Sequence, residues 1–237
     1  RLVPDGKRRE ETVVLDSRLL ATPALALGRA RDVTVQMAQC AVRALENALD
    51  AFTAYTPELA RSIREDEERC DHYEDIIGTY LVQLSSHSLS DGESQESTEL
   101  LKTIGDFERI SDHAVNVLES AEELQSKKLS FSPAAMAEYQ TLARATRRIL
   151  HLSLDSFRQD DPVQAAQVEP LEQVIDTLKE ELRTRHILRM RQGQCSIEAG
   201  FVWADLLTDL ERTSDHCSNV AGCVIDAGRH NLNLHAT

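Results

Sequence analysis

The chain has 237 residues, enough to bury a sizeable core as one large domain or two small ones. Only 4% of the residues are aromatic while 41% are hydrophobic, which favours helices over a β-sandwich or barrel. The formal net charge of −14 argues against nucleic acid as a partner, because phosphate binding requires a basic face. No stretch approaches the roughly 18 apolar residues that cross a bilayer, and no signal peptide is apparent.

The first half of the chain predicts a lead-in segment followed by three helices. Residues 1–22 show no sustained helical period. Thr22-Pro23 then begins a helix of about 30 residues, because proline is accepted at the first helical position after a threonine cap. Thr56-Pro57 begins a second helix that runs to about residue 88. The turn residues 90–92 precede a third helix over about residues 93–125.

The second half repeats this pattern. Ser132-Pro133 begins a helix that runs to about residue 159, and Asp161-Pro162 begins the next. The last helix is expected over about residues 196–229. Pro170 lies inside the fifth helix and predicts either a kink or a restart after Glu169.

An internal repeat joins the two halves. The segment Asp-Phe-Glu-Arg-Ile-Ser-Asp-His-Ala-Val-Asn-Val (106–117) matches Asp-Leu-Glu-Arg-Thr-Ser-Asp-His-Cys-Ser-Asn-Val (209–220) at eight of twelve positions. Three amphipathic helices with short loops pack most simply as an antiparallel bundle. We therefore expect an all-α protein of two tandem antiparallel three-helix bundles with six long helices. The first bundle spans residues 23–128 and the second spans residues 129–237.

Acidic residues recur at equivalent places in the two copies. Residues four apart on a helix project from one face, so the third helices present two pairs of acids and the second helices present two facing pairs. If such pairs converge, their repulsion is on the order of several kcal/mol unless cations, protons or arginines intervene. Converging carboxylates would supply hard oxygen ligands for a divalent metal or iron. The candidate metal ligands are Glu67, Asp71, Glu108, Asp112, Glu172, Asp176, Glu211 and Asp215.

Other interpretations of these acids stay open. In one of them the acids are solvated, or are neutralised by Arg109 and Arg212 in a metal-free scaffold. His113 and His216 adjoin the second acid of each motif, and a structural role for them is favoured over metal ligation. No histidine follows a glutamate by three positions, as in ferritin-like di-iron bundles, and no nucleotide or nucleophile motif is present. The sequence therefore favours a non-enzymatic protein without an organic cofactor.

The duplicated segments 106–117 and 209–220 resemble the third-helix motif of PhoU domains. PhoU-like proteins are tandem three-helix bundles, so the resemblance covers about residues 23–230. In that family the acidic motif can hold multinuclear metal clusters. Carried over by position, the resemblance implies metal ligation by Glu108, Asp112, Glu211 and Asp215, faced by the acids of the second helices.

Residues 15–27 resemble the junction after the membrane part of bacterial sodium/phosphate cotransporters. This resemblance implies a regulatory, cytoplasmic domain at the inner face of the cell membrane, whose partner is the transporter domain of the same polypeptide. Because the chain opens on Arg1, residues 1–22 are expected to follow a membrane domain. Two alternatives are a free-standing PhoU-type regulator of a separate phosphate transporter and a metal-carboxylate helical-bundle enzyme. A homo-oligomer is a further open alternative.

Overall fold

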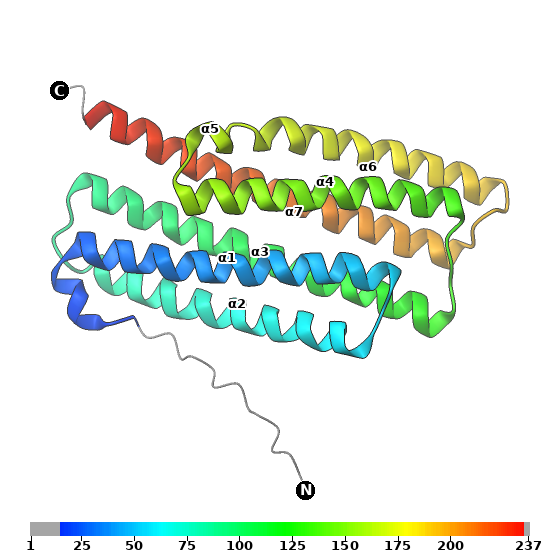
Figure 1. Ribbon diagram of the computed structural model, residues 1–237, viewed down its shortest axis with the longest axis horizontal. Coiled ribbons are helices and arrows are strands. Elements are labelled where there is room, and N and C mark those ends of the chain that lie inside the picture. Colours follow the sequence, from blue (N-terminus) through cyan, green and yellow to red (C-terminus); the bar gives the residue numbers. More distant parts are fainter. Residues whose placement is uncertain (1–14, 235–237) are drawn as a thin grey trace, which may run out of the picture.

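The computed structural model describes residues 15–234, with side chains described up to residue 228. In this part of the chain every regular element is a helix, and Figure 1 shows an elongated molecule of long, roughly parallel rods. This confirms the all-α prediction with six long helices. None of the described helices is both long and apolar enough to span a membrane. The elements are η1 (Ser17–Ala21), α1 (Pro23–Thr53), α2 (Pro57–Leu84), α3 (Asp91–Lys127), α4 (Pro133–Gln159), α5 (Pro162–Ala165), α6 (Val168–Arg191) and α7 (Ile197–Leu234).

Most helix starts follow the predicted capping chemistry. The side chains of Thr56 and Ser132 accept hydrogen bonds from backbone N–H groups of the following first turn, with proline next in sequence. Helix α1 begins at Pro23 as predicted, with Thr22 at the N-cap position, but the Thr22 side chain makes no capping hydrogen bond. Helix α3 begins two residues earlier than predicted, at Asp91, because Ser90 and Glu93 form a reciprocal capping box.

The predicted fifth helix consists of two pieces. Helix α5 is a single turn, and α6 restarts at Val168 after a break at residues 166–167. The break therefore comes before Glu169 rather than after it. Pro170 lies in the first turn of α6, where backbone N–H groups have no intrahelical partner, so the helix accommodates the proline there.

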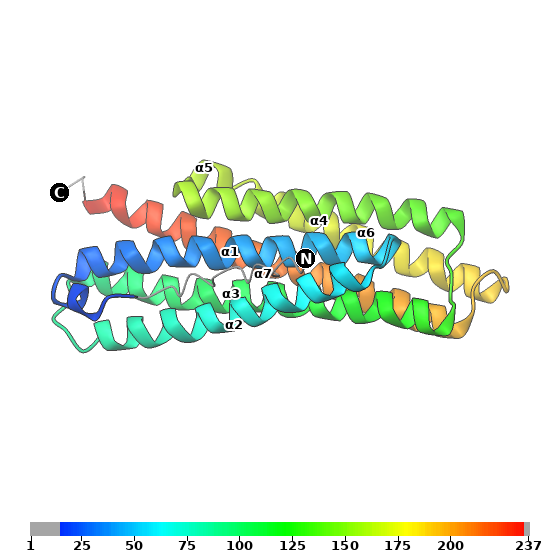
Figure 2. The same cartoon turned by 60° about the horizontal axis from the view of Figure 1, so that its bottom comes forward.

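The two groups of three long helices share a packed interface. Helix α1 contacts α2, α3 and α4, and α3 contacts α7. Figure 2 shows α1 between α4 on one side and α2 on the other. Phe107 of α3 packs edge-on against Phe157 of α4, with ring centroids 5.7 Å apart, and the Tyr139 hydroxyl of α4 donates to the Leu49 carbonyl of α1 at 2.6 Å. The boundary predicted after residue 128 falls at Lys128, the left-handed C-cap of α3.

Candidate functional site

Two triads of carboxylates lie at equivalent places in the two bundles. In each triad, two acids one turn apart come from the second long helix (α2 or α6), and one comes from the third (α3 or α7). One oxygen atom from each residue lies within 4.8 Å of those of the other two. The first triad is Glu67, Asp71 and Asp112, and the second triad is Glu172, Asp176 and Asp215.

The triads contain six of the eight predicted ligands. The register on α2 is set by the buried residues Asp66 and Cys70, which place the next residues, Glu67 and Asp71, beside the contact with α3. The two remaining predicted ligands, Glu108 and Glu211, lie one turn before Asp112 and Asp215 and fall outside the triads. Both triads are thus built from the residues that the repeat singled out, with one acid fewer at each.

The triads are electrostatically unfavourable without a cation. Burial, followed by repulsion from Asp71 and Asp112, raises the pKa of Glu67 above its ordinary value. In the second triad, burial and repulsion from Asp176 raise the pKa of Glu172 to about 7. One oxygen of Asp176, Oδ1, is buried and has no hydrogen-bond partner, an arrangement that costs about 1–3 kcal/mol. A bound cation would relieve the repulsion and satisfy this oxygen.

Basic residues compensate the two triads unequally. In the first bundle, Arg109 lies 3.5 Å from both the Glu108 and the Asp112 carboxylates. Burial and then repulsion from Asp112 nevertheless raise the pKa of Glu108 to about 7. In the second bundle, Lys179 pairs with Glu211 at 3.1 Å. Arg109, which the sequence suggested as a partner for these acids, therefore contacts the triad member Asp112 in the first bundle.

A reciprocal set of hydrogen bonds joins α3 to α7, and we call it the inter-repeat clasp. Asp209 Oδ1 lies 2.9 Å from His113 Nδ1 and accepts from Asn116 Nδ2 at 3.1 Å. The same bonds recur in the other direction, from His216 and Asn219 to Asp106, at the same 2.9 and 3.1 Å. The two imidazole rings lie 5.7 Å apart, so an approximate twofold axis passes between them.

The clasp accounts for the aspartate, the histidine and the asparagine that recur at the same spacing in both copies of the segment. The histidines have a structural role, as the sequence favoured. The aspartates at positions 106 and 209 were not singled out, although they open the duplicated segment. The repeat could have indicated them. Both copies keep the first aspartate and the histidine, which predicts that these two residues act together.

Replacement of Asp209 by alanine is expected to lower the free energy of unfolding by about 1–3 kcal/mol, because it leaves the buried His113 without its partner. Asp106→Ala should have a smaller effect, since the His216 side chain is 22% exposed against 8% for His113. Urea unfolding measures both values. The matched controls Asp209→Asn and Asp106→Asn keep one acceptor oxygen and should lose less. Equal losses for alanine and asparagine would contradict this account.

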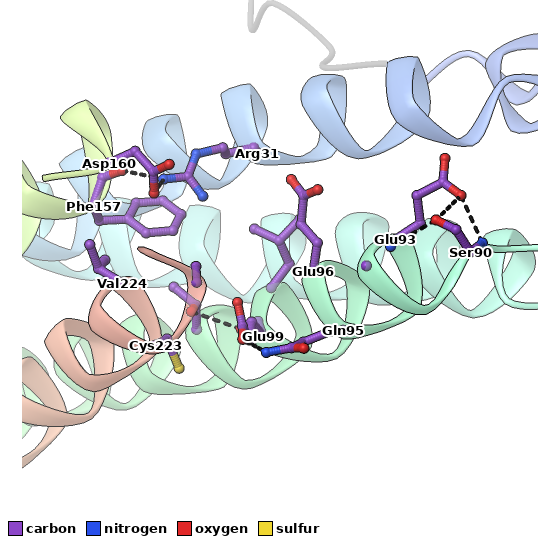
Figure 3. Close-up of a pocket in the computed structure, with 14 residues that line it drawn as sticks. Arg31, Ser90, Glu93, Gln95, Glu96, Glu99, Phe157, Asp160, Cys223 and Val224 are labelled. Carbon is purple, nitrogen blue, oxygen red and sulfur yellow. Dashed lines mark hydrogen bonds and ion pairs between the residues drawn. The ribbon is translucent and has the colours of Figure 1, made fainter. Parts of the chain in front are cut away.

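A separate cavity of about 310 Å³ lies between α1, α3, α4 and α7, away from both triads. Figure 3 shows Arg31 on one side, bonded to Asp160 at 2.9 Å, and Glu96 across the cavity. Burial raises the pKa of Glu96. Two of the other lining acids already have partners: Glu93 closes the capping box of α3, and Glu99 accepts from Gln95 at 2.9 Å. The acids of this cavity mostly serve the local structure.

Comparison with known proteins shows similarity over both bundles. The family described as PhoU domain matches residues 34–121 and 139–224, one stretch in each bundle. The chain is 25% identical over 182 residues to "Phosphate-specific transport system accessory protein PhoU homolog 1" of Thermotoga maritima, covering 76% of this chain and 78% of that protein. It is 23% identical over 197 residues to a PhoU homolog of Borreliella burgdorferi, covering 80% and 87% of the two chains.

Solved structures share the architecture. The crystal structure of PhoU from Pseudomonas aeruginosa superposes with a TM-score of 0.71 at 22% identity, covering 90% of this chain and 97% of that one. The regulatory protein PhoU from Streptococcus pneumoniae superposes with a TM-score of 0.77 at 17% identity, covering 87% and 97%. With both repeats matched by the family and the long helices arranged as in these structures, the chain belongs to the PhoU domain family.

Proposed function

We propose that this chain is a PhoU-type accessory regulator of phosphate uptake that acts on a separate transporter at the inner face of the membrane. The names of the relatives, phosphate-specific transport system accessory proteins, support the association with transport. The match extends over both repeats and most of each relative, which favours the free-standing regulator over the cotransporter domain.

The single structural observation that carries the proposal is the pair of equivalent carboxylate triads. Their oxygen-only donor sets fit hard divalent cations or iron, and the orphaned Asp176 Oδ1 fits a ligand atom. Glu67, Asp71 and Asp112 would hold one ion, and Glu172, Asp176 and Asp215 the other. The bound ion supplies positive charge where three carboxylates converge. Metal occupancy of the triads would then set the charge of the α2–α3 and α6–α7 surfaces to which a transporter or sensor binds.

A regulatory role is favoured over the enzyme alternative. Each triad consists of carboxylates alone, and the histidines of the duplicated motif are engaged in the inter-repeat clasp. A hydrolase or oxidase of this type needs an open coordination position beside a substrate pocket. The cavity of about 310 Å³ is lined by none of the triad residues, and a more open pocket of about 620 Å³ borders Glu108 but no triad member.

The cotransporter domain is the second candidate, and one observation favours it. Residues 15–21, part of the junction-like segment, are anchored to the first bundle. The Tyr80 hydroxyl of α2 donates to the Asp16 carbonyl at 3.2 Å, and Leu20 is buried. A domain preceding this segment would therefore be coupled directly to α1 and α2.

The test compares Asp112→Asn combined with Asp215→Asn against the wild type at the native locus. We expect the uptake of radiolabelled phosphate to remain high when cells are moved from low to high phosphate, whereas wild-type cells reduce uptake. The control variant, Glu65→Gln with Asp205→Asn, removes the same number of charges from exposed positions. Normal regulation in the triad variant at normal protein level would sink the proposal. Immunoblotting separates the two candidates, because a transporter domain would be detected only within a much larger membrane-embedded polypeptide.

A further inference from the structure

Two sulfur atoms and an imidazole nitrogen gather where α6 ends and α7 begins, on residues outside both triads. His186 and Met190 lie one turn apart on α6, and Cys195 lies in the loop that follows. Cys195 Sγ is 3.4 Å from His186 Nε2. A Cβ atom on Gly200 of α7 would overlap Met190 Sδ and would lie 3.6 Å from His186 Nε2. The thioether sulfur and the imidazole nitrogen therefore border the same space above Gly200.

The separation of the sulfur and nitrogen atoms fits a shared ion. Sulfur and nitrogen ligands at about 2.3 and 2.0–2.1 Å from one ion lie roughly 3.5–3.8 Å apart, for angles between tetrahedral and trigonal. The hydrogen bond between Cys195 Sγ and His186 Nε2, 3.4 Å long, is close to this separation. Met190 has three rotatable bonds, so its sulfur can turn toward the same point without a backbone shift. Glycine at position 200 leaves the room that this sulfur occupies.

The imidazole of His186 is held ready for such a ligand. The residue is only 3% exposed, and its ring stacks on Trp203 with centroids 5.4 Å apart. Nδ1 is buried and has no hydrogen-bond partner, so packing and the contact with Cys195 set the ring orientation.

Solvent reaches the cluster from one side. Met190 and Cys195 are half-buried, and residues 192–194 of the loop are exposed. On the inner side, Phe131 packs edge-on against Trp203 with centroids 5.1 Å apart, which makes an apolar floor. The nearby Arg189 is bound by Glu138 through two hydrogen bonds of 2.7 and 3.1 Å. This pairing holds the guanidinium on Glu138, which Arg185 also contacts at 3.6 Å.

We propose that His186 Nε2, Met190 Sδ and Cys195 Sγ bind one thiophilic metal ion, Cu(I). Thiolate and thioether sulfur favour soft ions, whereas the oxygen-only triads favour hard ones. Binding replaces the thiol proton of Cys195 by the ion and releases that proton to solvent. The chain then carries two chemically distinct classes of metal site, and this one does not depend on the proposed function of the triads.

The test is an anaerobic titration of the whole chain with Cu(I) buffered by a chromophoric chelator such as bicinchoninate. We expect one tightly bound Cu(I) per chain. Cys195→Ser should weaken binding by about 100-fold and Met190→Leu by about tenfold. Gly200→Ala, whose Cβ would displace the thioether, should act like Met190→Leu. The control Cys223→Ser, which alters the other half-buried cysteine, should bind like the wild type.

Three outcomes would overturn the proposal. Unchanged affinity in Cys195→Ser would place the copper elsewhere, and so would an equal loss in Cys223→Ser. Preference for Zn²⁺ over Cu(I), unaffected by Met190→Leu, would exclude the thioether as a ligand. Thermal unfolding of each apoprotein shows whether lost binding reflects lost structure. The Asp112→Asn, Asp215→Asn variant should bind Cu(I) normally, so failure at the triads and failure here are distinguishable.

Discussion

Metal-free protein carrying both Asp112→Asn and Asp215→Asn is expected to be more stable than metal-free wild type, although it should no longer bind metal at the triads. Each substitution removes one charge from a set of repelling carboxylates, a gain of about 1 kcal/mol per triad. Most of the gain in stability should come from Asp215→Asn. The substitution Asp112→Asn also removes the attraction between Asp112 and Arg109, whose charged groups lie 3.5 Å apart. If Asp112 and Asp215 instead stabilised the fold through ion pairs, the variant would be less stable than the wild type.

The gain should grow with pH. The folded protein holds the pKa of Glu172 at about 7, above its ordinary value of 4.5. Between these values the folded state binds more protons than the unfolded state, so the wild-type free energy of unfolding falls as pH rises. Asparagine at position 215 removes part of the repulsion that shifts Glu172. We therefore expect the difference between variant and wild type to be larger at pH 7.5 than at pH 5.

Adding a divalent cation should reverse the order of stability. At a free concentration 100 times its Kd, a ligand stabilises the folded state by about 2.7 kcal/mol, and only the wild type should gain this. Urea unfolding with chelator or with Mn²⁺ measures the four values, and Glu65→Gln with Asp205→Asn is the charge-matched control. A variant less stable than the wild type under chelator would contradict the role of the triads as cation sites.

Phe107→Ala is expected to lower the free energy of unfolding by about 3–5 kcal/mol, the largest effect of any single substitution considered. Phe107 is fully buried and packs on Phe157 across the boundary between the bundles. The Arg31 guanidinium covers Phe157, 4.7 Å from the ring centroid. Removing the Phe107 ring would leave a cavity that two packed bundles cannot close by moving one helix.

The repeat supplies the control for this substitution. The position equivalent to Phe107 in the second copy is Leu210, which is also fully buried. Phe107→Leu should therefore cost only about 1 kcal/mol, as expected for a change that nearly conserves volume. Urea unfolding of the metal-free proteins measures both. A loss below about 1 kcal/mol for Phe107→Ala would mean that the two bundles pack loosely and unfold independently.

The fold was accessible from the sequence because its determinants are local. Thr56-Pro57, Ser132-Pro133 and Asp161-Pro162 predicted helix starts within a residue, since capping depends on neighbours along the chain. The break before Pro170 was placed too late, because proline is tolerated in a first turn and does not itself mark the restart. The repeat fixed the number of bundles.

The candidate sites were accessible only in part, for a physical reason. The four-residue spacing of Glu67 and Asp71 showed that they share a face, and the triads contain them. The third acid of a triad depends on how α3 is rotated about its axis relative to α2. No local sequence pattern determines that rotation. Asp106 looked like any solvated acid until α7 was placed beside α3. The cluster around His186 likewise needed the position of Gly200 on the neighbouring helix.

The inter-repeat clasp has a consequence for the history of the chain. Each copy of the duplicated segment carries an aspartate, a histidine and an asparagine, yet neither copy can join them to one another, because the bonds run only between copies. Such mutual exchange of identical contacts is the form of a twofold-symmetric dimer interface. A single-copy ancestor with this segment could have completed the same bonds only by pairing with a second molecule. After gene duplication both halves of this interface lie on one polypeptide, so the bonds form within a single molecule at any protein concentration.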